Sequence, residues 1–270
     1  METRKQDDII VFDHVSKIFK TRFQSITAVK DFSMNIHRGE FVSILGPSGC
    51  GKSTIIRMMD GIIDPTEGDI YIEGEKTTTG KRLSPRILRK MGFVFQQPNM
   101  FPWYTVRENV ALPLKVFGLK GSEWETRVDR LMEMVGLQNY ANAYPVEISQ
   151  AQLQLAGVIR PMVYDPDILL MDEPFGSLDD MSREQMDMAI LDIWEKTGKT
   201  IIFITHNVEE AVLMSSRIYV MATNPGRLSE VVDIDLPCPR CLDMIVSERF
   251  IQYENRLTEL IGELDLSKIK

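Results

Sequence analysis

One nine-residue stretch constrains the fold of this 270-residue chain more than any other. It has the sequence GPSGCGKST, occupies positions 46–54 and follows the apolar run FVSIL at 41–45. It fits the pattern G-x-x-x-x-G-K-[ST], which requires a strand before it and a helix after it. Glycines let backbone N–H groups turn inward around phosphate oxygens, and the following helix directs its positive end at them. The sequence therefore predicts a phosphate loop formed by Gly46, Pro47, Ser48, Gly49, Cys50, Gly51, Lys52, Ser53 and Thr54.

Two side chains of this phosphate loop suit a nucleotide in particular. Lys52 can reach the β- and γ-phosphates, and the Ser53 hydroxyl can ligate Mg²⁺. The alternative is a glycine-rich turn that merely happens to hold a lysine, and the strand-loop-helix context argues against it. The sequence thus predicts a nucleotide site.

Short apolar runs and helical periods alternate along the chain, which indicates a parallel sheet covered on both faces. Spacing of apolar residues predicts a separate helical lobe from about 100 to 160. The predicted strands are 9–12, 32–36, 41–45, 69–72, 92–95, 167–172, 200–205 and 217–222. The other predicted helices are about 180–196, 207–215 and 244–262.

The composition of the chain limits the classes of binding partner and the cellular compartment that we expect. The net charge of −8 gives no general attraction to nucleic acid or anionic lipid, since both need clustered Lys and Arg. The N-terminus METRKQDD is charged and is not followed by the apolar h-region of a signal peptide, so we expect no signal peptide. No run reaches the roughly 18 apolar residues that span a bilayer. We therefore expect a cytoplasmic protein.

The three cysteines are Cys50, Cys238 and Cys241, too few for a disulfide framework in a chain of this size. Cys238 and Cys241 form a C-x-x-C, but no second ligand pair accompanies them. Two reduced bystander thiols are one interpretation, and a metal or redox role is the other.

Two acids follow the apolar run at 168–171. A ligand binds beyond the carboxyl ends of the strands in open α/β sheets, and Asp172 and Glu173 stand at such an end. Asp172 would hold Mg²⁺ through water, and Glu173 would orient or deprotonate the attacking water. A helix cap is the alternative role for such a pair, and the phosphate loop makes it the weaker one.

Gln96 and His206 each follow a predicted strand, and either one alone would be an ordinary polar residue at a strand end. The joint order of phosphate loop, Gln96, helical lobe, ILLMDEP and SLD at 168–179, and His206 is more specific. This order resembles the ATP-binding subunit of ABC transporters across nearly the whole chain.

The resemblance implies an α/β fold with a P-loop NTPase core, an antiparallel β subdomain and an inserted helical lobe. It implies one nucleotide-binding domain, with a core at about 1–98 and 164–235, a lobe at about 99–163 and a helical extension at about 236–270. ATP and Mg²⁺ are the implied cofactors. The resemblance implies that Gln96 senses Mg²⁺ and γ-phosphate and that His206 is the switch histidine. Ser177, Leu178 and Asp179 would form the loop that faces the partner subunit. Phe19 would stack on adenine, with core packing as the alternative.

Two segments point to a subgroup. Residues 99–110, NMFPWYTVRENV, resemble the segment after the glutamine in nitrate, sulfonate and taurine-type importers. The tail from Leu236 to Ile261 is also similar to that group. An importer subunit would work at the cytoplasmic face of the membrane with transmembrane permease subunits and, indirectly, a solute-binding protein. Phe101, Trp103 and Tyr104 would then line the groove for a short helix of a permease, or else pack the lobe.

The segment EISQAQLQLAGVIRP at 147–161 occupies the place of the family signature, Leu-Ser-Gly-Gly-Gln or near it. Ser149 is retained, whereas Gln150 and Ala151 replace both glycines. Glycine permits close backbone approach and φ > 0, and Gln150 adds a long side chain at the contact. Pro161 should end or kink the helix early.

In this family each signature completes the ATP site of the other subunit. An altered signature therefore predicts a heterodimer with one impaired site, and a homodimer that tolerates the changes remains open. A regulatory subunit with little hydrolysis of its own is a second reading. A soluble ABC ATPase acting on DNA or ribosomes is a third, which the acidic balance disfavours.

Overall fold

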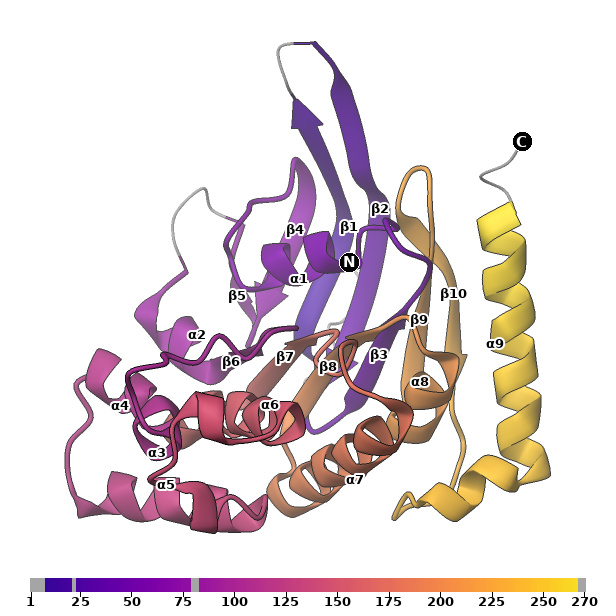
Figure 1. Ribbon diagram of the computed structural model, residues 1–270. Coiled ribbons are helices and arrows are strands. Elements are labelled where there is room, and N and C mark those ends of the chain that lie inside the picture. Colours follow the sequence, from indigo (N-terminus) through magenta and orange to yellow (C-terminus); the bar gives the residue numbers. More distant parts are fainter. Residues whose placement is uncertain (1–7, 21–22, 79–82, 267–270) are drawn as a thin grey trace. The chain divides into compact units, whose positions relative to one another are not determined.

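The computed structural model describes residues 8–20, 23–78 and 83–266 (Figure 1). It divides into two compact units, one made of residues 1–88 and 198–270 and the other of residues 89–197. This division differs from the predicted lobe at about 99–163, because the second unit also takes in the strands on either side of the lobe.

The first unit combines an antiparallel sheet with a mainly parallel one. Its elements are β1 (Asp8–Lys20), β2 (Ser25–His37), β3 (Phe41–Leu45), α1 (Lys52–Met59), β4 (Glu67–Ile72), β5 (Glu75–Lys76), β8 (Thr200–Thr205), α8 (Val208–Met214), β9 (Arg217–Ala222), β10 (Arg227–Asp233) and α9 (Glu248–Leu266). The antiparallel sheet has the order β2-β1-β4-β5, and the strands of the other sheet within this unit have the order β10-β9-β3-β8. Helix α2 (Pro85–Lys90) leads from this unit into the second.

The second unit is mostly helical. Its elements are β6 (Met91–Val94), α3 (Val106–Val110), α4 (Leu112–Val116), α5 (Ser122–Met134), α6 (Gln150–Ile159), β7 (Ile168–Asp172) and α7 (Asp180–Thr197). Strand β6 pairs in parallel with β7. Helix α5 buries Val128, Leu131 and Met132, the apolar face that its sequence predicts.

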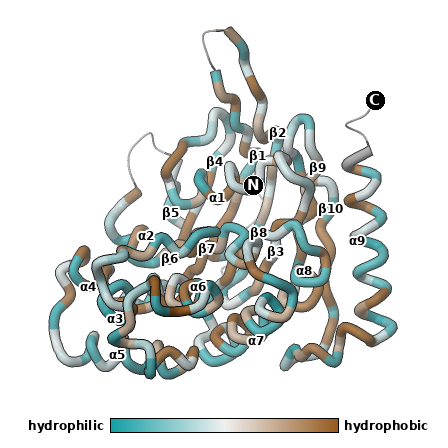
Figure 2. The backbone as a smooth tube through the Cα atoms, viewed as in Figure 1, coloured by the Kyte–Doolittle hydropathy of each residue, from teal (hydrophilic) through white to brown (hydrophobic). Residues whose placement is uncertain are grey.

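The expected α/β fold with an antiparallel β subdomain and a helical lobe is confirmed. Strands β3 and β8 are buried at every position and pair in parallel with each other, as continuous apolar runs predict. Hydrophobic residues run along β3, β8 and β9 (Figure 2). The predicted runs at 9–12 and 32–36 are only parts of β1 and β2, which extend to 13 residues each because they pair along their length.

Asp60 lies directly after α1, and its carboxyl group is half-buried there. Burial raises the pKa of the Asp60 carboxyl to about 6, although its Oδ1 accepts a hydrogen bond from Ile62 N at 2.9 Å. A raised folded pKa contributes stability at low pH that is lost as pH rises through about 6. Asp60→Asn should therefore stabilise the protein at pH 8 by about 1 kcal/mol, allowing for solvent screening of a half-buried group.

Chemical denaturation at pH 8 and pH 5 checks this expectation, since the advantage of Asp60→Asn should shrink at pH 5. The exposed Asp64, four residues further on, provides the matched control as Asp64→Asn. An Asp60→Asn difference of equal size at both pH values would contradict the assignment.

Candidate nucleotide site

The predicted phosphate loop lies between β3 and α1, in the context its sequence requires. Gly49 and Gly51 have φ values of 79° and 100°, a region that glycine enters without steric cost. Gly51 is also the N-cap residue of α1. The backbone therefore turns at two glycines before the helix starts, which leaves the first N–H groups of α1 available to an anion.

Two glycines also allow the loop to pack closely against neighbouring strands. A Cβ atom at Gly46 would lie 2.6 Å from the carbonyl oxygen of Met221 in β9. A Cβ atom at Gly51 would lie 3.0 Å from the carbonyl oxygen of Ala28 in β2. Gly46 therefore has no room for a side chain, and at Gly51 a side chain would be tightly packed as well as strained by the positive φ.

Lys52 is buried, and its ammonium group is held inside the loop. Its Nζ donates to the carbonyl oxygens of Gly46, at 2.7 Å, and Pro47, at 3.3 Å. The positive charge thus lies within the loop whose backbone turns around it. A phosphate bound there would meet both a cation and the start of a helix, which fits a nucleotide phosphate chain.

Strand register brings His206 to the same end of the sheet as the phosphate loop. Strands β3 and β8 run parallel, and their last paired residues are Leu45 and Thr205. Gly46 and His206 therefore leave neighbouring strands at adjacent positions, and His206 is exposed. Sequence reasoning missed Thr205 and Glu210, which hydrogen bond to each other beside this histidine.

Phe19 lies near the end of β1, opposite Ile26 of β2. Its side chain is 40% exposed, so core packing does not use the whole ring. Lys17 Nζ lies 5.2 Å from the ring centroid, within cation–π range. The ring has a face left for stacking, and adenine stacking stays a prediction.

In the second unit, strand register brings Gln96 and Glu173 to the same edge of the sheet. Strands β6 and β7 run parallel and end in the pair Val94 and Met171, so both segments leave the sheet at the same edge. A Cβ atom at Gly176 would lie 3.6 Å from Gln96 Nε2 and 3.9 Å from Glu173 Oε2. The amide of Gln96 and the carboxyl of Glu173 therefore both reach Gly176.

Glu173 has an unusual backbone. Its φ is 45°, in the left-handed region that non-glycine residues rarely adopt. Such strain often occurs at functional sites, where the surrounding structure holds it in place. Asp172 and Glu173 are both half-buried at the end of β7. Helix α7 begins only at Asp180, so neither acid is its N-cap residue.

Asp179 takes that capping task. Its carboxylate accepts hydrogen bonds from Ser182 N at 3.0 Å and from Ser182 Oγ at 2.7 Å. These bonds lower the pKa of the Asp179 carboxyl. Asp179 is nevertheless exposed, as is Ser177. The predicted loop toward a partner subunit thus presents a charged helix start.

The altered signature forms the first turn of α6. Ser149 is the N-cap residue: its Oγ accepts from Gln152 N at 3.2 Å, and Gln152 Oε1 accepts from Ser149 N at 2.9 Å. Ser149 and Gln150 are exposed. As predicted, the helix ends before Pro161, where a 3₁₀ helix begins.

The backbone of the signature segment differs from the expectation of positive φ. Gln150 and Ala151 are the first two residues of α6 and do not have positive φ. The backbone here therefore does not need the left-handed freedom of glycine. The Gln150 side chain is still larger than glycine at this exposed helix start, so we still expect it to hinder close approach of a phosphate.

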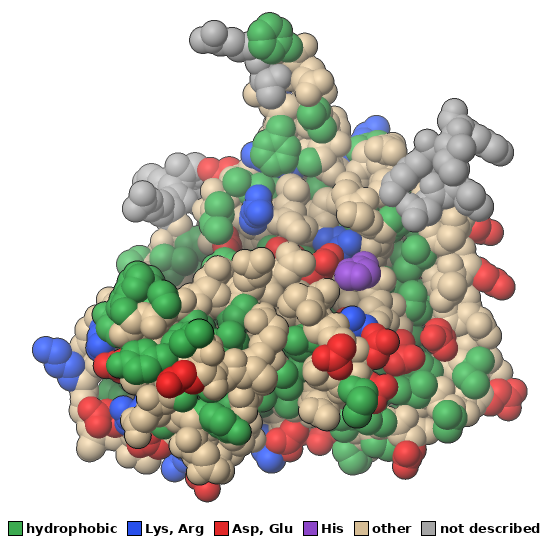
Figure 3. Space-filling view, viewed as in Figure 1, with side chains coloured by type: hydrophobic (Ala, Val, Ile, Leu, Met, Phe, Trp, Pro, Cys, Tyr) green, Lys and Arg blue, Asp and Glu red, His purple; other side chains and the backbone are tan. Residues whose placement is uncertain are grey.

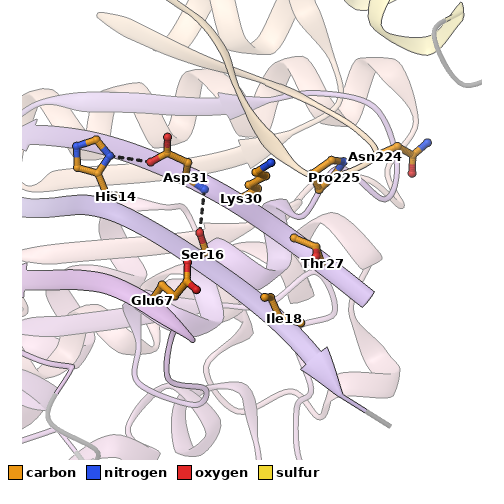
Figure 4. A pocket seen from close by; sticks show the side chains of 9 residues that line it. All are labelled: His14, Ser16, Ile18, Thr27, Lys30, Asp31, Glu67, Asn224 and Pro225. Atoms are coloured by element: carbon orange, nitrogen blue, oxygen red, sulfur yellow. Dashed lines mark hydrogen bonds and ion pairs between the residues drawn. The ribbon is translucent and has the colours of Figure 1, made fainter. Parts of the chain in front are cut away.

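A pocket of about 710 Å³ lies over β1 and β2 in the first unit (Figure 4). His14 and Asp31 pair in it, with Nδ1 and Oδ1 2.7 Å apart, and Asp31 N donates to Ser16 Oγ at 3.0 Å. The hydrogen bond to Asp31 raises the pKa of His14. None of the predicted nucleotide contacts lines this pocket, so it has no place in the candidate site.

Cys238 and Cys241 are both exposed. Among residues 8–20, 23–78 and 83–266, no group of three or more His, Cys, Asp and Glu side chains is arranged to hold a metal ion. The structure thus shows no third ligand beside this C-x-x-C in the part of the chain it describes.

Comparison with known proteins agrees with these motifs. A family model described as "ABC transporter" matches residues 29–176. The "Aliphatic sulfonates import ATP-binding protein SsuB" of Bacillus cereus is 37% identical over 231 residues, covering 86% of this chain and 88% of that protein. An "Uncharacterized ABC transporter ATP-binding protein MJ0412" of Methanocaldococcus jannaschii is 35% identical over 272 residues, covering 100% of this chain and 98% of that protein.

A solved structure is also similar. It is described as the dimeric structure of a post-hydrolysis state of the ATP-binding cassette MJ0796 bound to ADP and Pi. Its TM-score to this chain is 0.73 at 34% sequence identity, and the match covers 84% of this chain and 100% of that one.

Proposed function

Because the chain belongs to the ABC transporter family of ATP-binding proteins, we propose that it hydrolyses ATP to power a membrane importer of a small anion or organic solute. The observation that carries this proposal is the phosphate loop, with Lys52 held inside a glycine turn at the start of α1. The sulfonate importer relative supports a solute of nitrate, sulfonate or taurine type.

The residues present suit ATP and Mg²⁺. We expect the loop at 46–54 to bind the phosphates, Phe19 to stack on the adenine and His206 to contact the γ-phosphate. The side chains proposed to hold Mg²⁺ are those of Ser53, Gln96 and Asp172. Bound Mg²⁺ would neutralise charge on the phosphates, and Glu173 would orient or deprotonate the attacking water.

We place the subunit at the cytoplasmic face of the membrane, bound to permease subunits. In the described residues no helix is both long and apolar enough to cross a bilayer. Phe101 and Trp103 are 38% and 66% exposed, with ring centroids 5.2 Å apart. Tyr104 joins them at 5.9 Å from Phe101, and hydrophobic side chains gather around α3 and α4 on this unit (Figure 3). This exposure favours a docking groove for a permease helix over packing of the lobe.

We further propose that the chain forms a heterodimer with a second ATP-binding subunit that has an ordinary signature. The exposed Gln150 supports this, because its side chain projects from the helix start that would face the γ-phosphate of the other subunit. Ser149 and Asp179 would contact that same nucleotide. A regulatory subunit with little hydrolysis of its own is the second candidate, favoured by the same altered helix start.

Restoring the glycines tests the signature. Gln150→Gly with Ala151→Gly should raise steady-state ATP hydrolysis of the purified chain by about tenfold or more, because a donor group regains close approach to phosphate. Phosphate release with Mg²⁺ measures it, with Glu173→Gln as the blank. Gln150→Ala serves as a control that shortens the side chain without the cost of glycine to a helix.

The outcomes separate the readings. An unmodified chain that hydrolyses ATP well above the blank, with no gain from glycine, would support a homodimer that tolerates the changes. A chain that binds ATP and turns over only with the glycines restored would support the heterodimer. Binding without turnover in every sample would favour the regulatory subunit.

A further inference from the structure

A helix cap of unusual form surrounds His206 in the first unit. Asn207 is the N-cap residue of α8, and its Oδ1 accepts from Glu210 N at 3.3 Å. In an ordinary capping box the side chain of the third helical residue accepts from the N-cap N–H. Here that residue is Glu210, and its Oε2 instead accepts from the hydroxyl of Thr205.

Thr205 completes the connection. Its Oγ1 accepts a hydrogen bond from Asn207 N at 2.9 Å. The Thr205 hydroxyl therefore connects the Asn207 N–H to the Glu210 carboxyl. We call this hydrogen-bonded chain of Asn207, Thr205 and Glu210 the relay, and it passes through the last residue of β8. Thr205 is 3% exposed and Glu210 is 6% exposed, so these partners have little competition from water.

The relay holds the chain on both sides of a single residue. Thr205 and Asn207 are joined to each other, and both are joined to Glu210 in the first turn of α8. His206 lies between them and is exposed, while its neighbours are fixed. A helix start needs one capping side chain, and a second connection back to the strand restrains the residue at their junction.

We infer that Thr205 and Glu210 are positioning residues for His206, whose imidazole they aim by fixing the backbone on either side of it. This inference rests on the proposed role of His206 at the γ-phosphate. Catalytic groups act only within a narrow geometry, so a small displacement of the imidazole should reduce the chemical step more than ATP binding.

The test compares Thr205→Val with Thr205→Ser by steady-state ATP hydrolysis in the full chain carrying Gln150→Gly and Ala151→Gly, which is the reference chain because it is expected to turn over by itself. Thr205→Val removes the hydroxyl but keeps the shape, and it should lower kcat roughly tenfold or more with KM for ATP changed less than about twofold. Thr205→Ser keeps the hydroxyl and should stay within about twofold of the reference chain. Glu210→Gln keeps an acceptor oxygen and should fall between the two.

A double-mutant cycle separates positioning from general damage. In a His206→Ala background, Thr205→Val should cause no further loss, because the residue it positions is gone. Ser215→Ala is the matched control: it removes another buried hydroxyl contact, at 2.5 Å from Ser43 Oγ, and should leave kcat unchanged. Equal losses from Thr205→Val in both backgrounds would overturn the inference.

The three histidines of the chain permit a second readout. Side-chain NMR should show the His206 resonances moving on addition of Mg²⁺ and a non-hydrolysable ATP analogue, and moving less in Thr205→Val, with His14 and His37 as internal references. If His206→Ala leaves kcat unchanged, the proposed role of His206 fails and the inference fails with it. If His206→Ala lowers kcat while Thr205→Val changes neither kcat nor the His206 resonances, only the inference fails.

Discussion

In the chain carrying Gln150→Gly and Ala151→Gly, Glu173→Gln should lower ATP hydrolysis by about 10²- to 10⁴-fold, the usual contribution of a general base. The amide keeps the shape of the carboxyl and can occupy the same strained backbone, whose φ is 45°. Only the ability to take a proton from water is lost. ATP binding should therefore persist, and a fluorescent ATP analogue measured by equilibrium titration checks this beside steady-state phosphate release.

The control for this prediction is Glu195→Gln, the same chemical change at an exposed position of α7. It should leave both hydrolysis and ATP affinity unaltered. If Glu173→Gln keeps more than about a tenth of the hydrolysis rate, the loss is below the range expected for a general base. Glu173 would then not be the catalytic base.

Lys52→Met should weaken ATP binding by about 10- to 100-fold, as expected when a charged hydrogen bond to phosphate is lost. Lys52 is the buried cation of the loop, with Nζ 2.7 Å from the Gly46 carbonyl oxygen. ATP at 100 times its Kd should stabilise the unmodified protein by about 2.7 kcal/mol. Thermal unfolding with and without ATP measures this, and at the same ATP concentration the stabilisation of Lys52→Met should fall to about 1.4 kcal/mol or less, with a correspondingly smaller shift in Tm.

Lys30→Met offers a matched comparison, because Lys30 is an exposed lysine of β2 in the same unit. Its Tm shift with ATP should equal that of the unmodified chain. An undiminished ATP-dependent shift in Lys52→Met would place the phosphates elsewhere.

Several parts of the site could be predicted because they depend on short, continuous sequence. The phosphate loop is a run of nine residues whose glycines and lysine are spaced for one backbone path, and the structure has positive φ at Gly49 and Gly51. The carboxyl ends of β7 and β8 were also predictable, since each is a short apolar run that ends at or just before a polar residue, and the ends of β3 and β6 were predictable because the phosphate loop and Phe95-Gln96 follow them. Parallel register then aligns those ends in pairs.

Other features were missed because they depend on partners far along the chain or on backbone detail. Strand β10 has mixed polarity and forms by pairing with β9, so its own sequence signals it weakly. The length of β1 and β2 reflects their mutual pairing and exceeds the apolar runs within them. The helical backbone at Gln150 corrected the expected need for positive φ, because Ser149 caps the helix directly before it.

The family, the phosphate loop and the acidic and polar residues at strand ends followed from the amino-acid sequence, because they are encoded in local spacing and apolar periodicity. The contacts that these side chains make were known only from the folded structure. It made Asp179 and Ser149 helix caps, left Phe19 partly exposed and connected Thr205 to Glu210. The physical reason is that local backbone preference follows from neighbouring residues, whereas burial and hydrogen-bond partners depend on what the folded chain brings into contact.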